Sequence, residues 1–232
     1  MLRMQNVSKT YRHRGQMVTA LNGANAEIPD GDFVSIVGPS GSGKSTLLLM
    51  LGGMLSPSGG QVLLEDQSIY DLNSNARAEL RKQKIGFVFQ TFNLVPYLSA
   101  IENVQVPLYL VGEDSPSQQA RAEELLTRVG LSDRMHHKPC ELSVGEQQRV
   151  ALARMLANDP AEILAEEPTG NLDPETSRQV IEFLEEVNAE GRTVVMVTHD
   201  PRAAERAKRI LRLDRGAIVS EKAGRKTSHA AA

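Results

Sequence analysis

The chain has 232 residues and a mass of 25.4 kDa, which fits one large α/β domain or a domain that carries a small inserted lobe. Hydrophobic residues make up 41% of the chain and charged residues 24%, so there is ample material for a core. A formal net charge of -3, only 4% aromatic residues and no tryptophan count against a surface that binds nucleic acid, and the single cysteine excludes an internal disulfide.

The sequence shows no segment that would cross a bilayer. The most apolar run, residues 47–55, contains two glycines and is well short of the ~20 residues that a spanning helix needs. The N-terminus has no apolar core of the kind that signal peptides carry. We therefore expect a cytoplasmic protein that reaches a membrane only through a partner.

In chain order, β-rich runs alternate with segments of helical spacing. A run at residues 32–38 ends in glycine and precedes an apolar stretch at 45–54, which is the pattern of a strand, a tight loop and a helix. Further elements are predicted as strands at 85–89, 161–165 and 193–198 and as helices at 117–129 and 174–189. This alternation predicts an α/β fold with a mostly parallel central sheet and helices on both faces.

Two regions depart from the alternation. The interval of about 92–150 is helical and lacks strands, so we expect an inserted α-helical lobe within a domain that spans residues 1–220. Residues 221–232 mix charged with small residues and show no apolar period, which predicts a disordered tail.

The segment GPSGSGKS at residues 38–45 matches the phosphate-binding pattern G-x-x-x-x-G-K-[ST] and stands between a predicted strand and a predicted helix. Glycines let the backbone amides converge on one anion, and the following helix adds its positive end. Lys44 would reach the β- and γ-phosphates, and the Ser45 hydroxyl would bind Mg²⁺. The residues predicted to bind the nucleotide here are Gly38, Pro39, Ser40, Gly41, Ser42, Gly43, Lys44, Ser45 and Thr46.

A second apolar run, residues 163–165, leads into two adjacent acids, Glu166 and Glu167. Side chains alternate along a strand, so one acid can hold Mg²⁺ through water while the other polarises an attacking water molecule. No N-K-x-D motif for guanine is present, which counts against a GTPase.

Five further features resemble motifs of the ABC transporter ATPase family and occur in that family's order. They are an adenine-stacking aromatic residue at Tyr11, a Q-loop glutamine at Gln90, a signature motif with its helix at 142–154 (LSVGEQQRVALAR), a D-loop at 169–173 (TGNLD) and a switch histidine at His199. The resemblance covers about residues 2–220. It implies a P-loop NTPase fold with an N-terminal antiparallel β part, and ATP and Mg²⁺ as cofactors.

The resemblance also implies that ATP joins two copies of the chain. Each ATP would bind the P-loop of one copy and the signature of the other, through Ser143, Gly145 and Glu146 at the start of a helix. Asp173 would lie at the seam between the copies and link the two sites.

The remaining roles implied by the resemblance concern hydrolysis. Glu167 would orient or activate water, and His199 would contact the γ-phosphate, so these two are the predicted catalytic residues. The predicted Mg²⁺ ligands are Ser45, Gln90 and Glu166.

Two residues depart from the family's pattern. Glu166 stands where the family has aspartate, and its extra methylene must shift the water-mediated hold on Mg²⁺, whose octahedral geometry is strict. Val144 stands where the family has glycine, and because valine does not take positive φ easily, the signature loop must use a conformation open to a β-branched residue. Its side chain would either weaken the contact with the second copy or pack against the neighbouring lobe.

Segments near 92–104 and 167–173 resemble the subfamily of lipoprotein release, macrolide and peptide efflux, and division-associated ATPases. We therefore expect an integral-membrane permease as partner, with the chain held at the inner face of the cell membrane and cargo leaving that membrane. An alternative is a regulatory ATPase that signals through a membrane partner without transport. A soluble ABC ATPase acting on DNA or ribosomes is disfavoured, since the chain has one P-loop and no basic stripe, and no nucleic-acid partner is expected.

Overall fold

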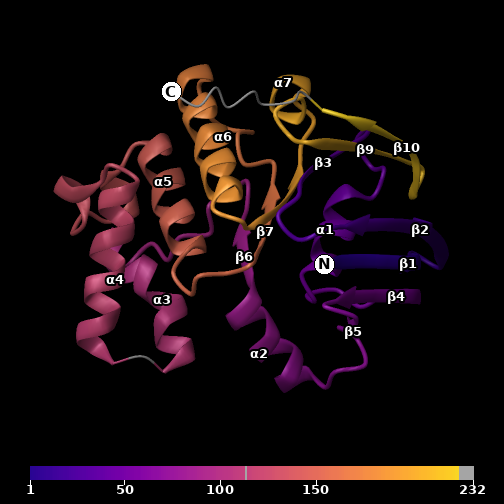
Figure 1. Cartoon of the computed structure of the whole chain (residues 1–232), viewed down its shortest axis with the longest axis horizontal. Coiled ribbons are helices and arrows are strands. Elements are labelled where there is room, and N and C mark those ends of the chain that lie inside the picture. The colour runs from indigo at the N-terminus through magenta and orange to yellow at the C-terminus, as the bar shows by residue number, and fades with distance from the viewer. Residues whose placement is uncertain (113, 225–232) are drawn as a thin grey trace.

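The computed structural model describes residues 1–112 and 114–224, apart from the side chain of His13. Two sheets form the body of the molecule, and a group of helices stands beside them (Figure 1). The antiparallel sheet has the order β2-β1-β4-β5. Its strands are β1 (Leu2–His13), β2 (Gln16–Ile28), β4 (Gly59–Leu64) and β5 (Gln67–Ser68).

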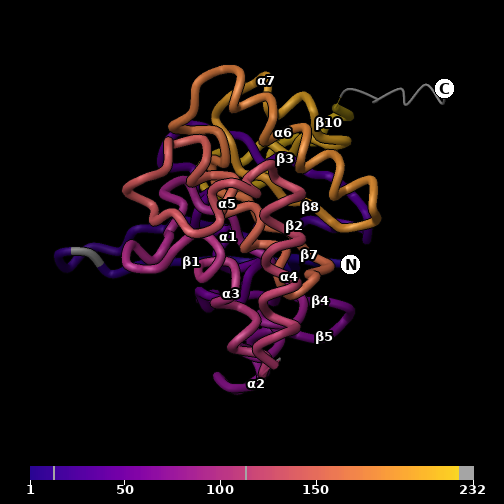
Figure 2. The backbone as a smooth tube through the Cα atoms, turned by 90° about the vertical axis from the view of Figure 1, so that its left-hand side faces the viewer, coloured from indigo at the N-terminus to yellow at the C-terminus, as the bar shows by residue number. Residues whose placement is uncertain are grey.

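The strands β1 and β2 form a long hairpin that projects from the body (Figure 2). Its two turn residues, Arg14 and Gly15, have φ of 50° and 81°. Positive φ at both positions is what a two-residue hairpin turn of the right-handed twist requires. This sheet is the antiparallel β part that the resemblance implied.

The second sheet has six strands in the order β10-β9-β3-β8-β7-β6. The strands β9, β3, β8, β7 and β6 run parallel, and β10 pairs antiparallel with β9. The bounds are β3 (Phe33–Val37), β6 (Ile85–Val88), β7 (Glu162–Glu166), β8 (Thr193–Val197), β9 (Arg209–Asp214) and β10 (Ala217–Ala223). The prediction of a mostly parallel central sheet is confirmed.

Both faces of this sheet are covered. Along β8, Val195 and Val197 pack into a core with the antiparallel sheet and α1, whereas Val194 and Met196 pack into a core with the helices on the other face. Such alternation follows from the two-residue period of a strand and explains why every residue of β8 is buried.

The bounds of the helices are α1 (Lys44–Leu51), α2 (Ser74–Lys84), α3 (Ala100–Val111), α4 (Ser115–Arg128), α5 (Val144–Met155), α6 (Pro174–Ala189) and α7 (Pro201–Ala204), with 3₁₀ turns η1 (Ser132–Arg134) and η2 (Pro139–Glu141). Helices α1, α4, α5 and α6 lie near the predicted ranges, whereas no bounds were predicted for α2, α3 and α7. Helix α1 ends before Gly52 rather than at residue 54, because Gly52 and the left-handed Gly53 close it.

The interval 92–150 contains α3, α4 and the first part of α5, which stand together at the left of Figure 1. We refer to α3, α4 and α5 as the helical lobe. The predicted tail starts at least four residues too early, and the amide of Gly224 donates to the carbonyl of Lys208 at 2.9 Å. Residues 221–223 continue β10, where Glu221, Lys222 and Ala223 pair with β9, because the antiparallel ladder supplies partners that composition alone does not reveal. The rest of the predicted tail, 225–232, lies outside the described residues.

Candidate nucleotide site

One edge of the parallel sheet gathers most of the predicted site residues. Because β3, β8, β7 and β6 are neighbours and run in the same direction, the loops at their carboxyl ends emerge side by side. These loops carry the segment 38–43, His199, Glu167 and Gln90, in that spatial order. The sheet thus brings together residues that lie more than a hundred positions apart in the chain.

The loop between β3 and α1 is closely packed against its surroundings. A Cβ at Gly38 would lie 2.1 Å from the carbonyl oxygen of Leu213, and one at Gly43 would lie 2.3 Å from that of Ala20. Gly43 also has φ of 103°, which an L side chain rarely adopts. Glycine is therefore required at Gly38 by packing, and at Gly43 by packing and by backbone conformation.

Lys44 lies over this loop. Its Nζ donates hydrogen bonds to the carbonyl oxygens of Gly38 at 2.9 Å and Pro39 at 3.1 Å, and no carboxylate among the described residues pairs with it. The Ser42 hydroxyl is buried without a hydrogen-bond partner in the part of the chain that the structure describes. An ammonium group that no carboxylate neutralises and a hydroxyl without a partner, both in this segment, suit an anionic ligand.

The start of α1 differs from that of every other described α-helix. No side chain accepts a hydrogen bond from its first turn, and no acidic residue stands there. The other α-helices each begin with a capping side chain, from Asn73, Ser99, Asp114, Ser143, Asp173 and Asp200. The first amides of α1, including those of Ser45 and Thr46, therefore remain available to a phosphate at the positive end of the helix.

Glu167 and His199 form a pair at the same edge. The Glu167 carboxylate accepts a hydrogen bond from the His199 amide at 3.1 Å, and its Oε2 lies 2.9 Å from Nδ1 of the imidazole. Glu167 is mostly buried, whereas His199 is largely exposed. Glu167 also has φ of 43°, and non-glycine residues held in the left-handed region concentrate at functional sites.

Two of the predicted Mg²⁺ ligands flank this pair. Glu166 is the last residue of β7 and lies in register with Val197, while Gln90 follows β6. A Cβ at Gly170 would lie 2.9 Å from Nε2 of the Gln90 side chain, so the loop after Glu167 packs directly against that side chain. No cluster of three or more His, Cys, Asp or Glu side chains stands within the described ranges. The predicted ligands Ser45, Gln90 and Glu166 instead offer one oxygen donor each, which suits an ion that keeps waters and phosphate oxygens as its other ligands.

The signature residues lie elsewhere, at the start of α5. In Figure 1, α6 and β7 separate this helix from α1. Ser143 caps α5 in a reciprocal box: its amide donates to the Glu146 carboxylate at 2.8 Å, and its hydroxyl accepts from the Glu146 amide at 3.3 Å. The backbone amide of Ser143, and after it the Ser143 hydroxyl, stabilise the charged Glu146 carboxylate and hold its pKa below its usual value. Val144 is the first helical residue of α5, a conformation open to a β-branched residue, and the residue is about half exposed.

Helix α5 also packs against α6. A Cβ at Gly145 would lie 2.9 Å from the Thr176 methyl group, and Thr176 in turn donates to Asp173 at 2.6 Å. Asp173 accepts three hydrogen bonds at the start of α6, and these lower its pKa. Within one chain, Asp173 thus acts as a helix cap beside the signature.

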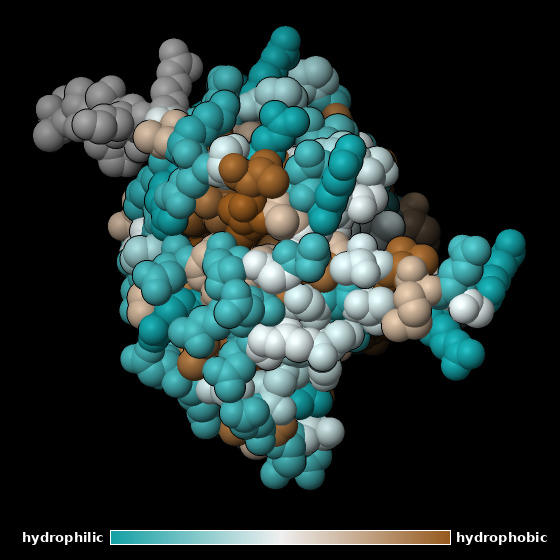
Figure 3. Space-filling view, turned by 90° about the vertical axis from the view of Figure 1, so that its right-hand side faces the viewer, coloured by the Kyte–Doolittle hydropathy of each residue, from teal (hydrophilic) through white to brown (hydrophobic). Residues whose placement is uncertain are grey.

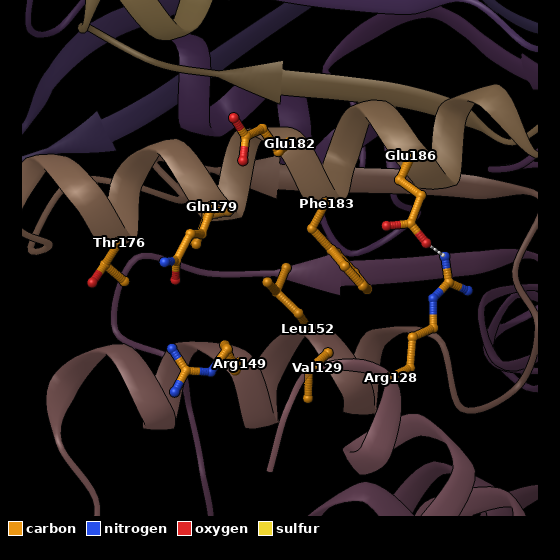
Figure 4. Close-up of a pocket in the computed structure, with 10 residues that line it drawn as sticks. Arg128, Val129, Arg149, Leu152, Thr176, Gln179, Glu182, Phe183 and Glu186 are labelled. Carbon is orange, nitrogen blue, oxygen red and sulfur yellow. Dashed lines mark hydrogen bonds and ion pairs between the residues drawn. The ribbon is translucent and has the colours of Figure 1, made fainter. Parts of the chain in front are cut away.

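A groove of about 300 Å³ runs between α4, α5 and α6 (Figure 4). Phe183 and Leu152 face each other across it. At one end the Arg128 guanidinium lies over the Phe183 ring at 5.2 Å and donates to Glu186 at 2.7 Å. This ion pair ties the lobe to α6 beside the signature helix.

Tyr11 lies on β1, opposite Val18 of β2, and is 38% exposed, with the Lys9 ammonium 5.3 Å from its ring centre. The hairpin reaches the P-loop at Ala20, whose carbonyl touches Gly43. On this side of the molecule, apolar side chains lie exposed among charged ones (Figure 3). At least half of the side-chain surface is exposed at Met17, Val18 and Val219.

Sequence reasoning missed two residues that hold the site together. Gln148 is buried in α5 and donates to the carbonyl of Pro168 at 2.8 Å, directly after Glu167. Arg154, near the end of α5, donates to the carbonyls of Phe92 and Asn93. Both lie within the segment that resembles the signature helix, but only the fold shows which loops they reach.

A family model described as "ABC transporter" matches residues 21–170, most of the segment that carries this site. An uncharacterised ABC transporter ATP-binding protein of Thermotoga maritima is 45% identical over 94% of this chain and 93% of its own length. The chain belongs to the ABC transporter ATP-binding family.

Solved structures of this ABC family agree with the assignment. The ATP-binding cassette MJ0796 of Methanocaldococcus jannaschii, in a dimeric post-hydrolysis state bound to ADP and Pi, matches with a TM-score of 0.91 and 42% identity over 97% of this chain and 99% of the other. The predicted P-loop NTPase fold is confirmed, as is the identification of the chain as an ATP-binding subunit and ATPase of this family.

The macrolide export ATP-binding/permease protein MacB of Escherichia coli is 43% identical over 97% of the chain but only 35% of its own length. The chain thus spans about a third of this ABC relative. None of the helices that the structure describes combines the length and apolarity needed to cross a bilayer.

Proposed function

We propose that the chain hydrolyses ATP in a site shared by two copies, and that hydrolysis drives a membrane permease. The observation that carries the proposal is the carboxyl edge of the sheet, where the uncapped α1 and its P-loop share one edge with the Glu167–His199 pair and Gln90. An uncapped helix start supplies phosphate binding, and a carboxylate near it supplies water activation.

Lys44 and the first amides of α1 would hold the β- and γ-phosphates. Ser45, Gln90 and Glu166 would hold Mg²⁺, which when bound neutralises charge on the phosphates. Tyr11 would pack on the adenine ring. Its half-exposed position on the hairpin next to the P-loop supports that role.

Glu167 would accept a proton from, or orient, the attacking water. His199 already holds the Glu167 carboxylate with its amide and imidazole, so the acid is fixed in position before ATP binds. His199 is largely exposed and would contact the γ-phosphate from the same edge.

A second copy would complete the site. Ser143 and Val144 are exposed at the start of α5, and two solved structures of the related cassette MJ0796 are dimeric. Ser143, Gly145 and Glu146 of one copy would face the phosphate bound by the other. Asp173, beside Gly145 through Thr176, would lie at the seam between them.

A permease would dock in the groove between the sheet and the helical lobe. Its lining is largely apolar and includes Phe87, Phe89, Val106 and Leu110. The name of MacB couples ATP binding to a permease and to macrolide export, which supports a membrane partner and drug-like cargo. Lipoprotein or peptide cargo and attachment at the inner face of the membrane rest on the resemblance of the sequence to that subfamily.

The shared ATP site is tested with Glu167→Gln, which keeps the shape of the side chain but removes the carboxylate. We expect hydrolysis to fall by about 100-fold or more while ATP binding persists, so that the variant accumulates as a dimer in ATP on size-exclusion chromatography. The parent without nucleotide is the monomeric control. Hydrolysis at the parental rate in Glu167→Gln would rule out this role.

Glu166→Asp tests the first departure from the family pattern. The shorter acid should raise ATP turnover or Mg²⁺ affinity, because it restores the reach that the family uses. Steady-state rates over a Mg²⁺ titration measure this, with Glu166→Gln as the variant that removes the charge. Identical titrations for parent and aspartate variant would contradict it.

Transport is tested by co-purifying the chain with a candidate permease and reconstituting the pair in vesicles. Cargo movement that needs ATP and stops in Glu167→Gln supports an export function. ATP-dependent dimerisation and permease binding without any cargo movement would favour the regulatory alternative.

A further inference from the structure

Arg154 connects the end of α5 to the loop that follows Gln90. Its Nη1 donates to the carbonyl of Asn93 at 2.6 Å and its Nη2 to the carbonyl of Phe92 at 2.5 Å. One planar guanidinium thus holds two consecutive carbonyls, a geometry that its fork of donors makes possible and that lysine cannot reproduce.

The loop that Arg154 holds has an unfavourable backbone. Phe92 and Asn93 have φ of 58° and 50°, and the left-handed region is unfavourable for a bulky residue such as phenylalanine, though asparagine tolerates it better. Within the loop, short-range bonds oppose this cost, from the Phe92 amide to Phe89, from the Asn93 amide to Thr91, and from the Thr91 hydroxyl to the Asn93 side chain. From other elements, Asn103 of α3 holds the later part of the loop at Val95, and the Arg154 guanidinium binds the carbonyls of the two left-handed residues themselves.

Arg154 has no acidic partner among the residues that the structure describes, and burial lowers its pKa. Its charge is balanced by carbonyl dipoles alone. Losing the loop would leave a poorly hydrated cation without acceptors, so arginine and loop hold each other in place.

The same loop reaches the nucleotide edge through Gln90. The Asn171 side-chain amide donates to the Gln90 carbonyl at 3.4 Å, and Gly170 lies against the Gln90 side chain. Gln90 is therefore held between the loop after Glu167 and the segment clamped by Arg154. The other end of α5, about 15 Å away along the helix axis, carries Ser143 and Val144.

We infer that Arg154 is a positioning residue that makes the Gln90 loop and the signature helix of one chain move as a unit. This inference rests on the proposed function. In a shared-site dimer, Gln90 belongs to one ATP site and the signature of the same chain to the other. Arg154 therefore couples the two ATP sites, so that occupancy sensed at Gln90 alters the signature presented to the second nucleotide.

The test compares the full-length parent with Arg154→Gln and Arg154→Lys. Hydrogen exchange is followed at residues 89–94, where the Phe92 and Asn93 amides are hydrogen-bonded. Phosphate release is measured against ATP concentration. In Arg154→Gln we expect exchange at 89–94 to rise about tenfold and the Hill coefficient of hydrolysis to fall towards one, with ATP affinity within about twofold of the parent. Arg154→Lys keeps the charge but loses the paired donors of the guanidinium, so its exchange rate and Hill coefficient should lie between those of the parent and Arg154→Gln. It replaces Arg154→Gln in the test if the glutamine variant does not fold.

The matched control is Arg121→Gln on α4. Arg121 also donates to a carbonyl at the end of α5, that of Leu156 at 3.3 Å, but does not touch the Gln90 loop. It should leave exchange at 89–94 and cooperativity at parental values. If both Arg154 variants keep the parental exchange rate at 89–94 and the parental Hill coefficient, the inference about Arg154 is wrong. The shared ATP site would still stand in that case, provided that Glu167→Gln dimerises in ATP. A parent that hydrolyses without cooperativity would overturn the coupling, and a Glu167→Gln variant that stays monomeric in ATP would overturn the shared site as well.

Discussion

The helix starts of α1 and α5 are both assigned to phosphate, yet the chain prepares them differently. At α1 no side chain caps the amides of the first turn, and the charged group beside them is the Lys44 ammonium. At α5 the first turn is closed by Ser143 and Glu146, whose carboxylate also lies 3.4 Å from the Arg134 guanidinium. An uncapped helix start is ready to bind an anion alone, whereas a capped and negatively charged one binds an anion less readily.

This difference assigns an order to the two contacts. The P-loop side can bind ATP in a single chain, since its donors are preformed. On the signature side, the Ser143 and Glu146 amides are engaged in the cap and a carboxylate stands beside them, so a phosphate is bound less readily there, which fits a contact made late, when two copies meet. The predictions that follow remove features of one helix start at a time.

Lys44→Ala should have the largest effect. The ammonium group stands among carbonyls beside a glycine-rich loop, and loss of such a charge on a phosphate costs about 2 kcal/mol or more, or about 30-fold in ATP affinity. Calorimetric titration of the monomer with ATP measures the loss. Lys84→Ala, which removes an ammonium paired with Glu65 on the surface, is the matched control. An unchanged ATP affinity in Lys44→Ala would contradict the view that the start of α1 is ready to bind phosphate in a single chain.

Glu146→Gln should strengthen ATP-driven dimerisation by up to about fivefold in the background of Glu167→Gln. Glutamine keeps the capping hydrogen bonds but removes a negative charge from the helix start that faces the second nucleotide. Dimer dissociation constants in ATP measure the effect. Glu141→Gln, a nearby carboxylate that caps η2 instead, should change little. Weaker dimerisation in Glu146→Gln would mean that the carboxylate itself binds across the seam.

Val144→Gly should tighten the same dimer by about twofold if the exposed valine hinders the approach of the second copy. The folded chain should lose about 0.5 kcal/mol in the free energy of unfolding, because glycine is costly in a helix. Val144→Ala separates the two causes, since it shortens the side chain without freeing the backbone. Unchanged dimerisation in both variants would show that the departure from the family's glycine carries no penalty.

Ser143→Ala should have the smallest effect, about 0.5 kcal/mol in the free energy of unfolding at neutral pH, because the capping bond is long and near the surface. The pKa of Glu146 is lowered in the folded chain, so its contribution is present above its unfolded pKa of about 4.5 and is lost as pH falls through the lower folded value. Urea unfolding at pH 7 and pH 4 should therefore show a smaller difference between variant and parent in acid. An equal difference at both values would mean that the Ser143 hydroxyl does not contribute to the lowered pKa of Glu146.

The sequence was sufficient to predict the elements of the parallel sheet that carry the nucleotide motifs, β3, β6, β7 and β8. Strand β8 is β-branched because both of its faces are covered, and α6 was predicted with the bounds Pro174–Ala189 because its cap and apolar spacing are local features. Strands β9 and β10 were not predicted, and in β10 Glu221 and Lys222 are polar, so that only pairing with β9 makes them a strand. Pairing between distant segments leaves no local pattern when the residues face solvent.

The P-loop, the acids at the end of β7, His199 and the signature were all apparent in the sequence, because each is a short motif with its own chemistry. The tertiary structure decided how they relate. Parallel neighbours in the sheet bring Glu167 to within 2.9 Å of His199, and the packing of α5 places Arg154 on the carbonyls after Gln90. The chemistry of a motif depends on residues that are close in sequence. Which loops meet depends on strand order and helix packing, and no short segment of the chain determines these.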